Sequence, residues 1–305
     1  MREMSVVAIV NPISGVGANP RAAAERAALL REAARKRGLN LEIEFTSRGG
    51  HARELAESAV RGGATLVVVW GGDGTLNEAG SALIGTDAVL GLVPAGSGNG
   101  LAAALEVPRD PLAALAAAFD GSPRAIDVGV MAGRPFFNIA GVGFDARVAR
   151  LFNARAPGRR GGWPYVVIGV REGCRYRGAE YTLELDGSTQ NVRAFLISFA
   201  NGREYGIGAR IAPDARLDDG VLDVTVVEDR AILTRFWHAR HLALGTPHLA
   251  PSVKAHRASH AVVETSGPIE FHVDGEMGIA EDRIEVRLLP GALRVMAPRP
   301  SSVSG

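Results

Sequence analysis

Four short β-rich runs alternate with longer helical runs between residues 5 and 127. The β-rich runs are SVVAIV, LEIEFT, TLVVVW and AVLGLV, which begin at residues 5, 41, 65 and 88. Apolar residues at helical spacing lie between them, over 21–37, over 51–61 and from about Thr75 onward. This alternation is typical of parallel strands joined by crossover helices. The sequence therefore predicts an N-terminal α/β domain, doubly wound around a mostly parallel sheet, over residues 1–127.

The pattern changes after Asp127 to many β-rich segments separated by turns. These segments are FFNIAGVGF, YTLELDG, VRAFLISFA, VLDVTVV, HAVVETSG, IEFHVDGE and RIEVRLL. Helical inserts are expected at about 165–176 and 231–244. A mostly β second domain is therefore predicted over 128–290, and composition predicts a disordered tail from Pro298.

Length, charge and cysteine content limit the class of protein. A chain of 305 residues favours two domains, and a formal net charge of +1 gives no global attraction for nucleic acid, so no nucleic-acid partner is predicted. Cys174 is the single cysteine, which excludes an internal disulfide and a multi-cysteine metal site. No leader-like segment precedes Ser5, and no apolar run approaches the about 18 residues that span a bilayer. We expect a cytoplasmic protein, with peripheral membrane contact as an option.

Three glycine-rich loops follow the first, third and fourth strands. They are NPISGVG at 11–17, GGDGTLNE at 71–78 and PAGSGNG at 94–100. The carboxyl ends of parallel strands share one edge of the sheet, so all three loops should open there. Glycine permits close backbone approach, and helix N-termini after two of the loops attract anions. One such loop alone would be explained by a tight turn, but three in register predict a phosphate cradle.

Two common nucleotide motifs do not explain this cradle. The sequence has no G-x-x-x-x-G-K-[ST], and its two lysines, Lys36 and Lys254, are far from the glycine loops. Leu101 breaks the G-x-G-x-x-G/A spacing, and GVGFDA at 141–146 fits it formally but lies in the β-rich part. Phosphate charge must therefore be met by amides, arginine and metal.

The motifs together resemble the diacylglycerol kinase catalytic superfamily, which includes bacterial lipid kinases, sphingosine kinases and ceramide kinases. In order they are NPISG, the segment from Thr46 to GHA at 50–52, GGDGTLNE, PAGSGNGLA, FFNIAGVGFDA, LDDGVLDV and FHVDGE. The GGDGT motif is shared with NAD kinases and phosphofructokinases, whereas the later motifs are those of the lipid-kinase branch. The resemblance implies a nucleotide domain, a β-sandwich substrate domain, and a last strand within 291–305 that returns to the first domain.

The resemblance also implies a set of ATP contacts in and beside the glycine loops. They are Asn11, Pro12, Ser14, Gly15, Thr46, Gly71, Gly72, Asp73, Gly74, Thr75, Leu76, Asn77, Glu78, Gly96, Ser97, Gly98 and Asn99. Many bacterial relatives have threonine at Ser97 and an acidic residue at Gly100. Asp73 is the acid nearest the expected triphosphate, so we interpret it as a catalytic residue that orients magnesium or its water shell. The alternative is an N-cap carboxylate on the helix that follows it.

Phosphoryl transfer also needs a group that positions the acceptor hydroxyl and takes its proton. FHVDGE supplies two acids, and the resemblance implies that Glu276 is the proton acceptor, with Asp274 as the close alternative. A plain D-G turn would explain the motif without chemistry. LDDGVLDV resembles the family's structural magnesium site, which implies Asp219 and the carbonyls of Arg216 and Val221 as ligands. A D-D-G hairpin turn is the alternative there.

Arginines and aromatic residues gather between residues 147 and 177. They are Arg147, Arg150, Arg155, Arg159, Arg160, Arg171, Arg175 and Arg177, with Trp163, Tyr165 and Tyr176. This composition suits anionic lipid headgroups and predicts transient contact with a membrane surface, although a solvated charged face explains it equally well.

The sequence as a whole predicts an ATP- and Mg-dependent kinase that phosphorylates a hydroxyl of a diacylglycerol- or sphingosine-like lipid. The alternatives are a kinase acting on NAD or another small metabolite, and a nucleotide- or lipid-binding regulator without catalysis. The sequence does not determine the oligomeric state and is compatible with a homodimer.

Overall fold

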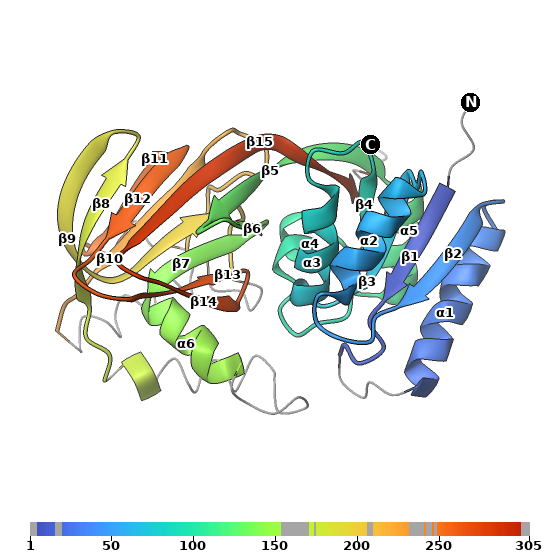
Figure 1. The fold of residues 1–305 in the computed structure, drawn as a ribbon, viewed down its shortest axis with the longest axis horizontal. Helices are drawn as coiled ribbons and strands as arrows, with labels where there is room; N and C mark the ends of the chain where they lie inside the picture. The colour runs from blue at the N-terminus through green and yellow to red at the C-terminus, as the bar shows by residue number, and fades with distance from the viewer. Residues whose placement is uncertain are drawn as a thin grey trace. The chain divides into compact units, whose positions relative to one another are not determined.

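The computed structural model describes residues 5–15, 20–153, 171–173, 175–205, 210–231, 241, 246 and 249–299. The chain divides into two compact units (Figure 1). Unit 1 comprises Met1–Ile126 and Gly291–Gly305, and unit 2 comprises Asp127–Pro290. The predicted helical inserts at 165–176 and 231–244 fall largely outside the described residues, and so does most of the predicted tail. The roles predicted for the two domains stay predictions at this point.

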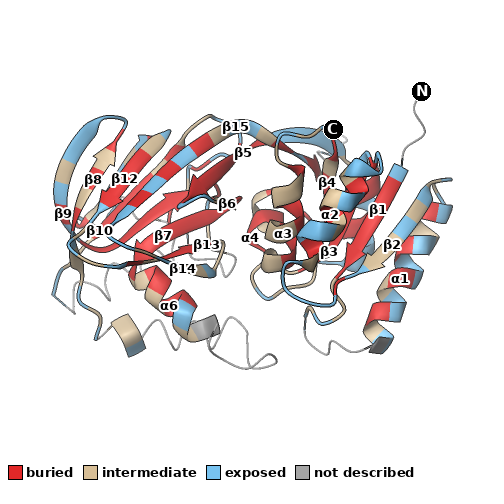
Figure 2. Cartoon of the chain, in the orientation of Figure 1, coloured by how far each residue is buried: buried red, intermediate tan, exposed pale blue. Residues whose placement is uncertain are grey.

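Unit 1 contains a parallel sheet. Its strands are β1 (Ser5–Val10), β2 (Asn40–Phe45), β3 (Leu66–Gly71), β4 (Val89–Pro94) and the C-terminal part of β15 (Arg283–Ala297). They lie in the order β15-β4-β3-β1-β2, and each neighbouring pair is parallel. Every residue of β3 is buried, as expected for a central parallel strand with a continuous apolar sequence (Figure 2).

The described residues of unit 1 contain five helices. They are α1 (Pro20–Arg35), α2 (His51–Arg61), α3 (Asp73–Leu83), α4 (Gly100–Ala104) and α5 (Pro111–Asp120). The sequence favours the start of α5 at Pro111. The side chain of the N-cap residue, Asp110, accepts a hydrogen bond from Ala113 N at 2.9 Å, and Pro111 occupies the first turn. Helix α2 buries a stripe of small residues at Ala52, Ala56 and Ala59. These elements connect the strands so that four carboxyl ends share one edge.

Unit 2 is built from antiparallel strands and one described helix of more than one turn. Its elements are β5 (Ser122–Met131), β6 (Arg134–Phe136), β7 (Ile139–Gly143), α6 (Phe144–Asn153), β8 (Ala179–Leu185), β9 (Ser188–Ala200), β10 (Leu222–Glu228), β11 (Val253–Ala258), β12 (His260–Glu264), β13 (Ile269–Val273), β14 (Glu276–Ala280) and the first part of β15. Pairing runs β14-β13-β7-β9-β8-β12-β15, and β10 lies between β9 and β11. Strand β5 also contributes its first residues to unit 1.

Alternation along the strands of unit 2 separates two faces. One face forms a core in which each of these residues is 3% exposed or less: Ala140, Val142, Ile197, Phe199, Val224, Val226, Phe271 and Val273. The other face of β7 and β13 packs against α6. Figure 2 shows β7 buried throughout.

The predicted fold class, an α/β unit followed by a mostly β unit, is confirmed. Helix α6 was not predicted, because its first residue, Phe144, ends a segment whose sequence is typical of a strand. Gly143, with φ +93°, ends strand β7 and turns the chain into the helix. Among the described residues, no helix is long and apolar enough to cross a bilayer.

Candidate active site

Unit 1 brings the glycine loops together at the carboxyl ends of its strands. Asn11 directly follows β1, and its Nδ2 donates to Thr75 Oγ1 at 2.8 Å, which joins the first loop to α3. A Cβ added at Gly15 would lie 2.7 Å from Ala95 O, so the first loop also approaches the loop after β4. Thr46 follows β2 and is buried at 8% exposure. The four strand ends thus present the predicted residues at one edge.

The second and third loops touch through their backbones. A Cβ on Gly96 would lie 2.9 Å from Gly72 Cα, and a Cβ on Gly98 would lie 2.7 Å from Asp73 Oδ2. Neither glycine has a positive φ in this structure, so close approach rather than turn geometry requires glycine here. Larger side chains would push the two loops apart.

Asp73 fastens the third loop. Its Oδ2 accepts a hydrogen bond from Asn99 N, and its Oδ1 accepts one from Gly100 N, both at 2.7 Å. The carboxylate therefore caps α4, whereas Gly72 is the N-cap residue of α3. The alternative interpretation, in which the Asp73 carboxylate caps the helix that follows it, is wrong, because the carboxylate caps α4 and not α3. The predicted role of Asp73 in orienting magnesium stays a prediction.

Asn99 closes the third loop on itself. Its side chain is buried at 7% exposure, with Oδ1 accepting from Gly96 N at 2.8 Å and Nδ2 donating to Gly96 O at 2.7 Å. The backbone of Asn99 has φ +59°, a region that asparagine tolerates better than most residues. Ser97, between these anchors, stays exposed. The loop is thus fixed with one hydroxyl at its tip.

Arg26 is a site residue that sequence reasoning missed. Its Nη1 donates to Asn11 O at 2.7 Å and to Ser14 Oγ at 3.1 Å, and its Nη2 donates to Ser14 O at 2.7 Å. The guanidinium carbon lies 5.9 Å from the centroid of the Trp70 ring. Burial lowers the pKa of Arg26 from its usual value. In the sequence, Arg26 is one of several arginines on the predicted helix after NPISG, and no motif distinguishes it from the others.

Glu78 holds the start of a different helix. Its Oε1 accepts from Gly50 N at 2.8 Å and its Oε2 accepts from Ala52 N at 3.2 Å, at the N-terminus of α2. Gly50 itself provides no side chain for a cap. Glu78 therefore connects α3 to α2 and orders the segment after Thr46, while its predicted contact with ATP stays a prediction. Pro12, Gly71, Gly74, Leu76 and Asn77 lie in the same loops and first turns.

Unit 2 places its two candidate acids on a tight turn between β13 and β14. Val273 pairs with Glu276, and the two residues between them have positive φ, +48° at Asp274 and +87° at Gly275. Two left-handed residues in a two-residue hairpin loop, with Asp-Gly as their sequence, are typical of a type I′ turn. The D-G turn predicted as an alternative is therefore present, and it carries both acids.

Asp274 and Glu276 differ sharply in their surroundings. Asp274 Oδ2 accepts from Phe137 N at 2.8 Å, and Oδ1 accepts from Asn138 N at 3.0 Å and Ile139 N at 3.1 Å. Glu276 is exposed, and its carboxylate makes no hydrogen bond or ion pair within the described part of the chain. Asp274 thus anchors the turn, whereas the Glu276 side chain is exposed to solvent, and the choice between them as proton acceptor stays a prediction.

The LDDGVLDV segment forms a turn with several nearby carboxylates. Asp219 is exposed, with Oδ1 3.4 Å from Val221 N, and Asp127 Oδ2 accepts from Gly220 N at 2.8 Å. Burial raises the pKa of Asp223, and the negative charges of Asp219 and Asp214 raise it further, while Arg257 opposes them.

Arginines pair with two of the carboxylates at this turn, Arg216 with Asp218 at 3.8 Å and Arg257 with Asp223 at 3.3 Å. Asp223 Oδ2 is buried and has no hydrogen-bond partner among the described residues. The described part of the chain holds no group of three or more His, Cys, Asp or Glu side chains able to bind a metal ion. A site with Asp219 and the carbonyls of Arg216 and Val221 would need one such side chain, so it stays a prediction.

The arginine-rich segment is described in part. Arg147 pairs with Glu172 at 3.3 Å, and Arg150 pairs with Glu270 at 3.5 Å. Residues 154–170, which contain three of its arginines and Trp163, lie outside the described residues. Contact with a membrane therefore stays a prediction.

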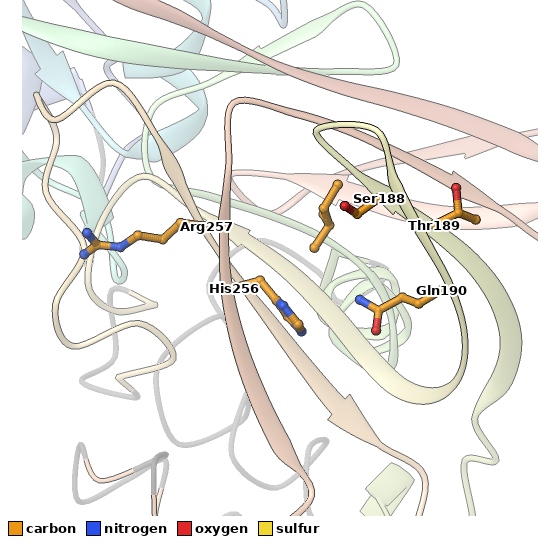
Figure 3. A pocket seen from close by; sticks show the side chains of 6 residues that line it. Ser188, Thr189, Gln190, His256 and Arg257 are labelled. Atoms are coloured by element: carbon orange, nitrogen blue, oxygen red, sulfur yellow. The ribbon is translucent and has the colours of Figure 1, made fainter.

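A cavity of about 410 Å³ lies elsewhere in unit 2, beside the β8–β9 turn and β11. Its lining residues are Leu185, Ser188, Thr189, Gln190, His256 and Arg257. Figure 3 shows the His256 ring and the Gln190 amide extending toward the same space. None of the predicted site residues lines this cavity.

Comparison with known families bears on these sites. Residues 5–131 match the diacylglycerol kinase catalytic domain, and residues 138–297, more than half of the chain, match the "YegS C-terminal NAD kinase beta sandwich-like domain". The chain belongs to the diacylglycerol kinase family. The predicted resemblance and the predicted enzyme class, a lipid kinase, are therefore confirmed.

Individual relatives of this kinase cover nearly its whole length. A protein of Mycobacterium tuberculosis named "Diacylglycerol kinase" is 34% identical over 96% of this chain and 95% of its own length. A "Probable lipid kinase YegS-like" of Chromohalobacter salexigens is 30% identical over 88% of each chain. A solved structure of a diacylglycerol kinase from Bacillus anthracis has a TM-score of 0.73 at 20% identity, with 99% of this chain and 100% of that chain covered. The last comparison shows the same fold.

Proposed function

We propose that this kinase transfers the γ-phosphoryl group of ATP to a hydroxyl of a diacylglycerol- or sphingosine-like lipid, with magnesium. The observation that carries the proposal is the exposed Glu276 carboxylate, held on a turn that Asp274 anchors through three backbone N–H groups. A carboxylate of this kind suits the acceptance of a proton, and the family membership points to a lipid acceptor.

The loops of unit 1 would hold the triphosphate of ATP. Backbone N–H groups of glycine-rich loops, together with the first turn of α3, form an anion-binding surface that requires no lysine. Asn99 and Arg26 support this surface by holding the third and first loops in shape. Ser97 would offer its exposed hydroxyl to a phosphate oxygen. This arrangement accounts for nucleotide binding without a P-loop sequence.

Glu276 would act on the acceptor. The lipid hydroxyl oxygen forms a bond to the γ-phosphorus, the bond from that phosphorus to the bridging oxygen of ADP breaks, and the hydroxyl proton passes to the Glu276 carboxylate. Such proton transfer typically contributes about 10²- to 10⁴-fold to a rate. The products are ADP and a lipid phosphomonoester.

Magnesium fits the donor groups present. Asp73 is the carboxylate of the second phosphate loop, where its oxygens accept the N–H groups of Asn99 and Gly100 at 2.7 Å, and carboxylate oxygens are the ligand type that magnesium and its bound waters prefer. When bound with ATP, magnesium would neutralise phosphate charge. Asp219 would hold the second ion proposed for unit 2. A Mg²⁺ titration should raise the melting temperature of the chain without nucleotide, and Asp219→Asn should remove that rise.

The test of the function is transfer of labelled γ-phosphate from ATP to a panel of lipids in detergent micelles, with NAD as a soluble acceptor. The Glu276→Gln variant serves as the catalytic control. Glu281→Gln, which changes an exposed glutamate five residues away, serves as the matched control. Label on a lipid that is lost in Glu276→Gln and kept in Glu281→Gln supports the proposal. Label on NAD alone, or on none of the acceptors, contradicts it.

A further inference from the structure

A row of small and polar residues crosses unit 2 on the sheet face that packs against α6. Ser198 of β9, Gly141 of β7 and His272 of β13 lie in register on three neighbouring strands. Ser198 is fully buried and His272 is 3% exposed. Buried polar groups cost free energy unless they are hydrogen-bonded, so the bonds that this row makes need an explanation.

His272 is hydrogen-bonded at both ring nitrogens. Gly275 N lies 3.3 Å from Nδ1, and Asp145 Oδ2 lies 3.2 Å from Nε2. A backbone N–H can only donate, so Nδ1 is the acceptor and Nε2 carries the ring proton, which faces the carboxylate. One bond of the ring therefore reaches the turn that bears Glu276, and the other reaches the first turn of α6.

Asp145 is buried at 5% exposure, and its carboxylate accepts hydrogen bonds from several groups. Its Oδ1 accepts from Ala146 N at 2.8 Å, and its Oδ2 accepts from the Tyr205 hydroxyl at 3.1 Å, which in turn lies 3.4 Å from Ser198 Oγ. A Cβ at Gly141 would lie 2.2 Å from Asp145 Oδ2, so glycine leaves the space that the carboxylate fills. The N-terminus of α6 also favours a negative charge at this position.

The turn itself is held on two sides. The segment 137–139 donates three N–H groups to Asp274, and the His272 ring accepts the N–H of Gly275. Gly275 lies between the two acids, so its orientation sets the direction in which the chain enters β14 at Glu276. A shift of about 1 Å at a reacting group can cost about 100-fold in rate.

We propose that His272 is a positioning residue that fixes the Asp274–Gly275–Glu276 turn and thereby the place of the Glu276 carboxylate, and that Asp145 keeps the ring proton on Nε2 so that Nδ1 stays the acceptor for Gly275 N–H. The proposal rests on the proposed function of Glu276. A purely structural role is the competing explanation. Apolar residues of similar volume can often replace a buried polar pair at no loss of stability, so stability alone does not explain a pair that reaches the turn.

Two variants separate the two bonds of the ring. The side-chain amide of asparagine can occupy the place of Nδ1, so His272→Asn keeps an acceptor for Gly275 N–H. The amide of glutamine reaches the place of Nε2, so His272→Gln keeps a donor to Asp145 and loses the acceptor for the turn. His260→Gln is the matched control, because His260 Nε2 also lies 3.1 Å from a carboxylate oxygen, that of Glu285, at an exposed site.

The two readouts are amide hydrogen exchange at Gly275 and steady-state kinetics with ATP and lipid. His272→Gln should speed Gly275 exchange and lower kcat, each by about tenfold, the effect of losing one hydrogen bond, with the KM for ATP unchanged. His272→Asn should stay much closer to the unaltered chain in both, and His260→Gln should change neither. If His272→Gln does not fold, Asp145→Asn takes its place. An amide nitrogen at the position of Oδ2 would make Nε2 the acceptor and move the ring proton to Nδ1, so Gly275 exchange should again become faster, and unchanged exchange would overturn the proposal.

Unchanged Gly275 exchange in His272→Gln would overturn the proposal, and so would a fall in kcat accompanied by faster exchange throughout β13 and β14. Equal losses in the asparagine and glutamine variants would also overturn it. If the unaltered chain phosphorylates no lipid, the proposed function fails. Gly275 exchange then still decides whether His272 holds the turn, because that readout requires no activity.

Discussion

Asp274 and Glu276 lie two residues apart, yet their substitutions should fail in different ways. Asp274→Asn replaces one carboxylate oxygen by an NH2 group, which cannot accept a hydrogen bond. The three N–H groups that Asp274 accepts belong to Phe137, Asn138 and Ile139, which are 1%, 8% and 1% exposed. At least one buried donor is therefore left without its acceptor.

The size of the loss follows from these bonds. An unsatisfied buried donor costs about 1 to 3 kcal/mol, and each of the two remaining bonds loses about 1 kcal/mol when the acceptor is no longer charged, so the total is about 3 to 5 kcal/mol. At about 2 to 4 °C for each kcal/mol, the melting temperature of unit 2 should fall by about 6 to 20 °C. Glu276→Gln changes an exposed side chain, so its free energy of unfolding should stay within about 0.5 kcal/mol.

The assay is differential scanning calorimetry together with the initial rate of lipid phosphorylation, measured well below the lower melting temperature. Glu276→Gln should lose about 10²- to 10⁴-fold in kcat at an unchanged melting temperature. Asp274→Asn should lose stability and a smaller share of kcat. An Asp274→Asn variant with an unchanged melting temperature and no activity would refute the assignment of anchor and base.

Three further predictions concern single residues. The folded-state pKa of Asp223 is raised, so its protonated form stabilises the chain at low pH, and this contribution is lost as the pH rises through the raised value. The melting temperature of Asp223→Asn minus that of the unaltered chain should therefore increase from about pH 4 upward. A difference that stays constant with pH would count against the raised pKa. Arg26→Gln should raise the KM for ATP about tenfold by releasing the first loop, whereas Arg31→Gln on the exposed side of α1 should leave it unchanged in the same kinetic assay. Gly98→Ala places a Cβ 2.7 Å from a carboxylate oxygen and should weaken ATP binding measured by calorimetry, while Gly267→Ala, with open space around it, should not.

The strands of unit 1 were predictable because each is a short β-rich run bounded by polar or glycine-rich sequence. SVVAIV corresponds to β1 at the same residues, and the other three differ from the structure by one residue. Helix α6 was not predictable in this way. It follows β7 through Gly143 without a break in apolar sequence, and its buried acid, Asp145, finds its partners on β13 and at Tyr205.

The composition of the candidate site was more predictable than the roles of its members. The glycine loops can be recognised from their local sequence. The hydrogen bonds that hold the site together join residues far apart in the sequence. Asp73 accepts from Asn99, and Arg26 donates to Asn11. Asp274 accepts from residues 137–139, more than 130 positions away. No local pattern encodes such pairs. For the same reason, the sequence left two acids open as the base, and our proposal of Glu276 rests on their different surroundings.

The most direct test of the central claim is ³¹P NMR of the chain with ATP, magnesium and diacylglycerol or sphingosine in detergent micelles. The account predicts that the γ-phosphate resonance disappears while ADP and a lipid phosphomonoester appear in equal amounts. Glu276→Gln should leave the spectrum of ATP unchanged over the same time. Formation of inorganic phosphate without a phosphomonoester, or an unaltered ATP spectrum with the unaltered chain, would contradict it.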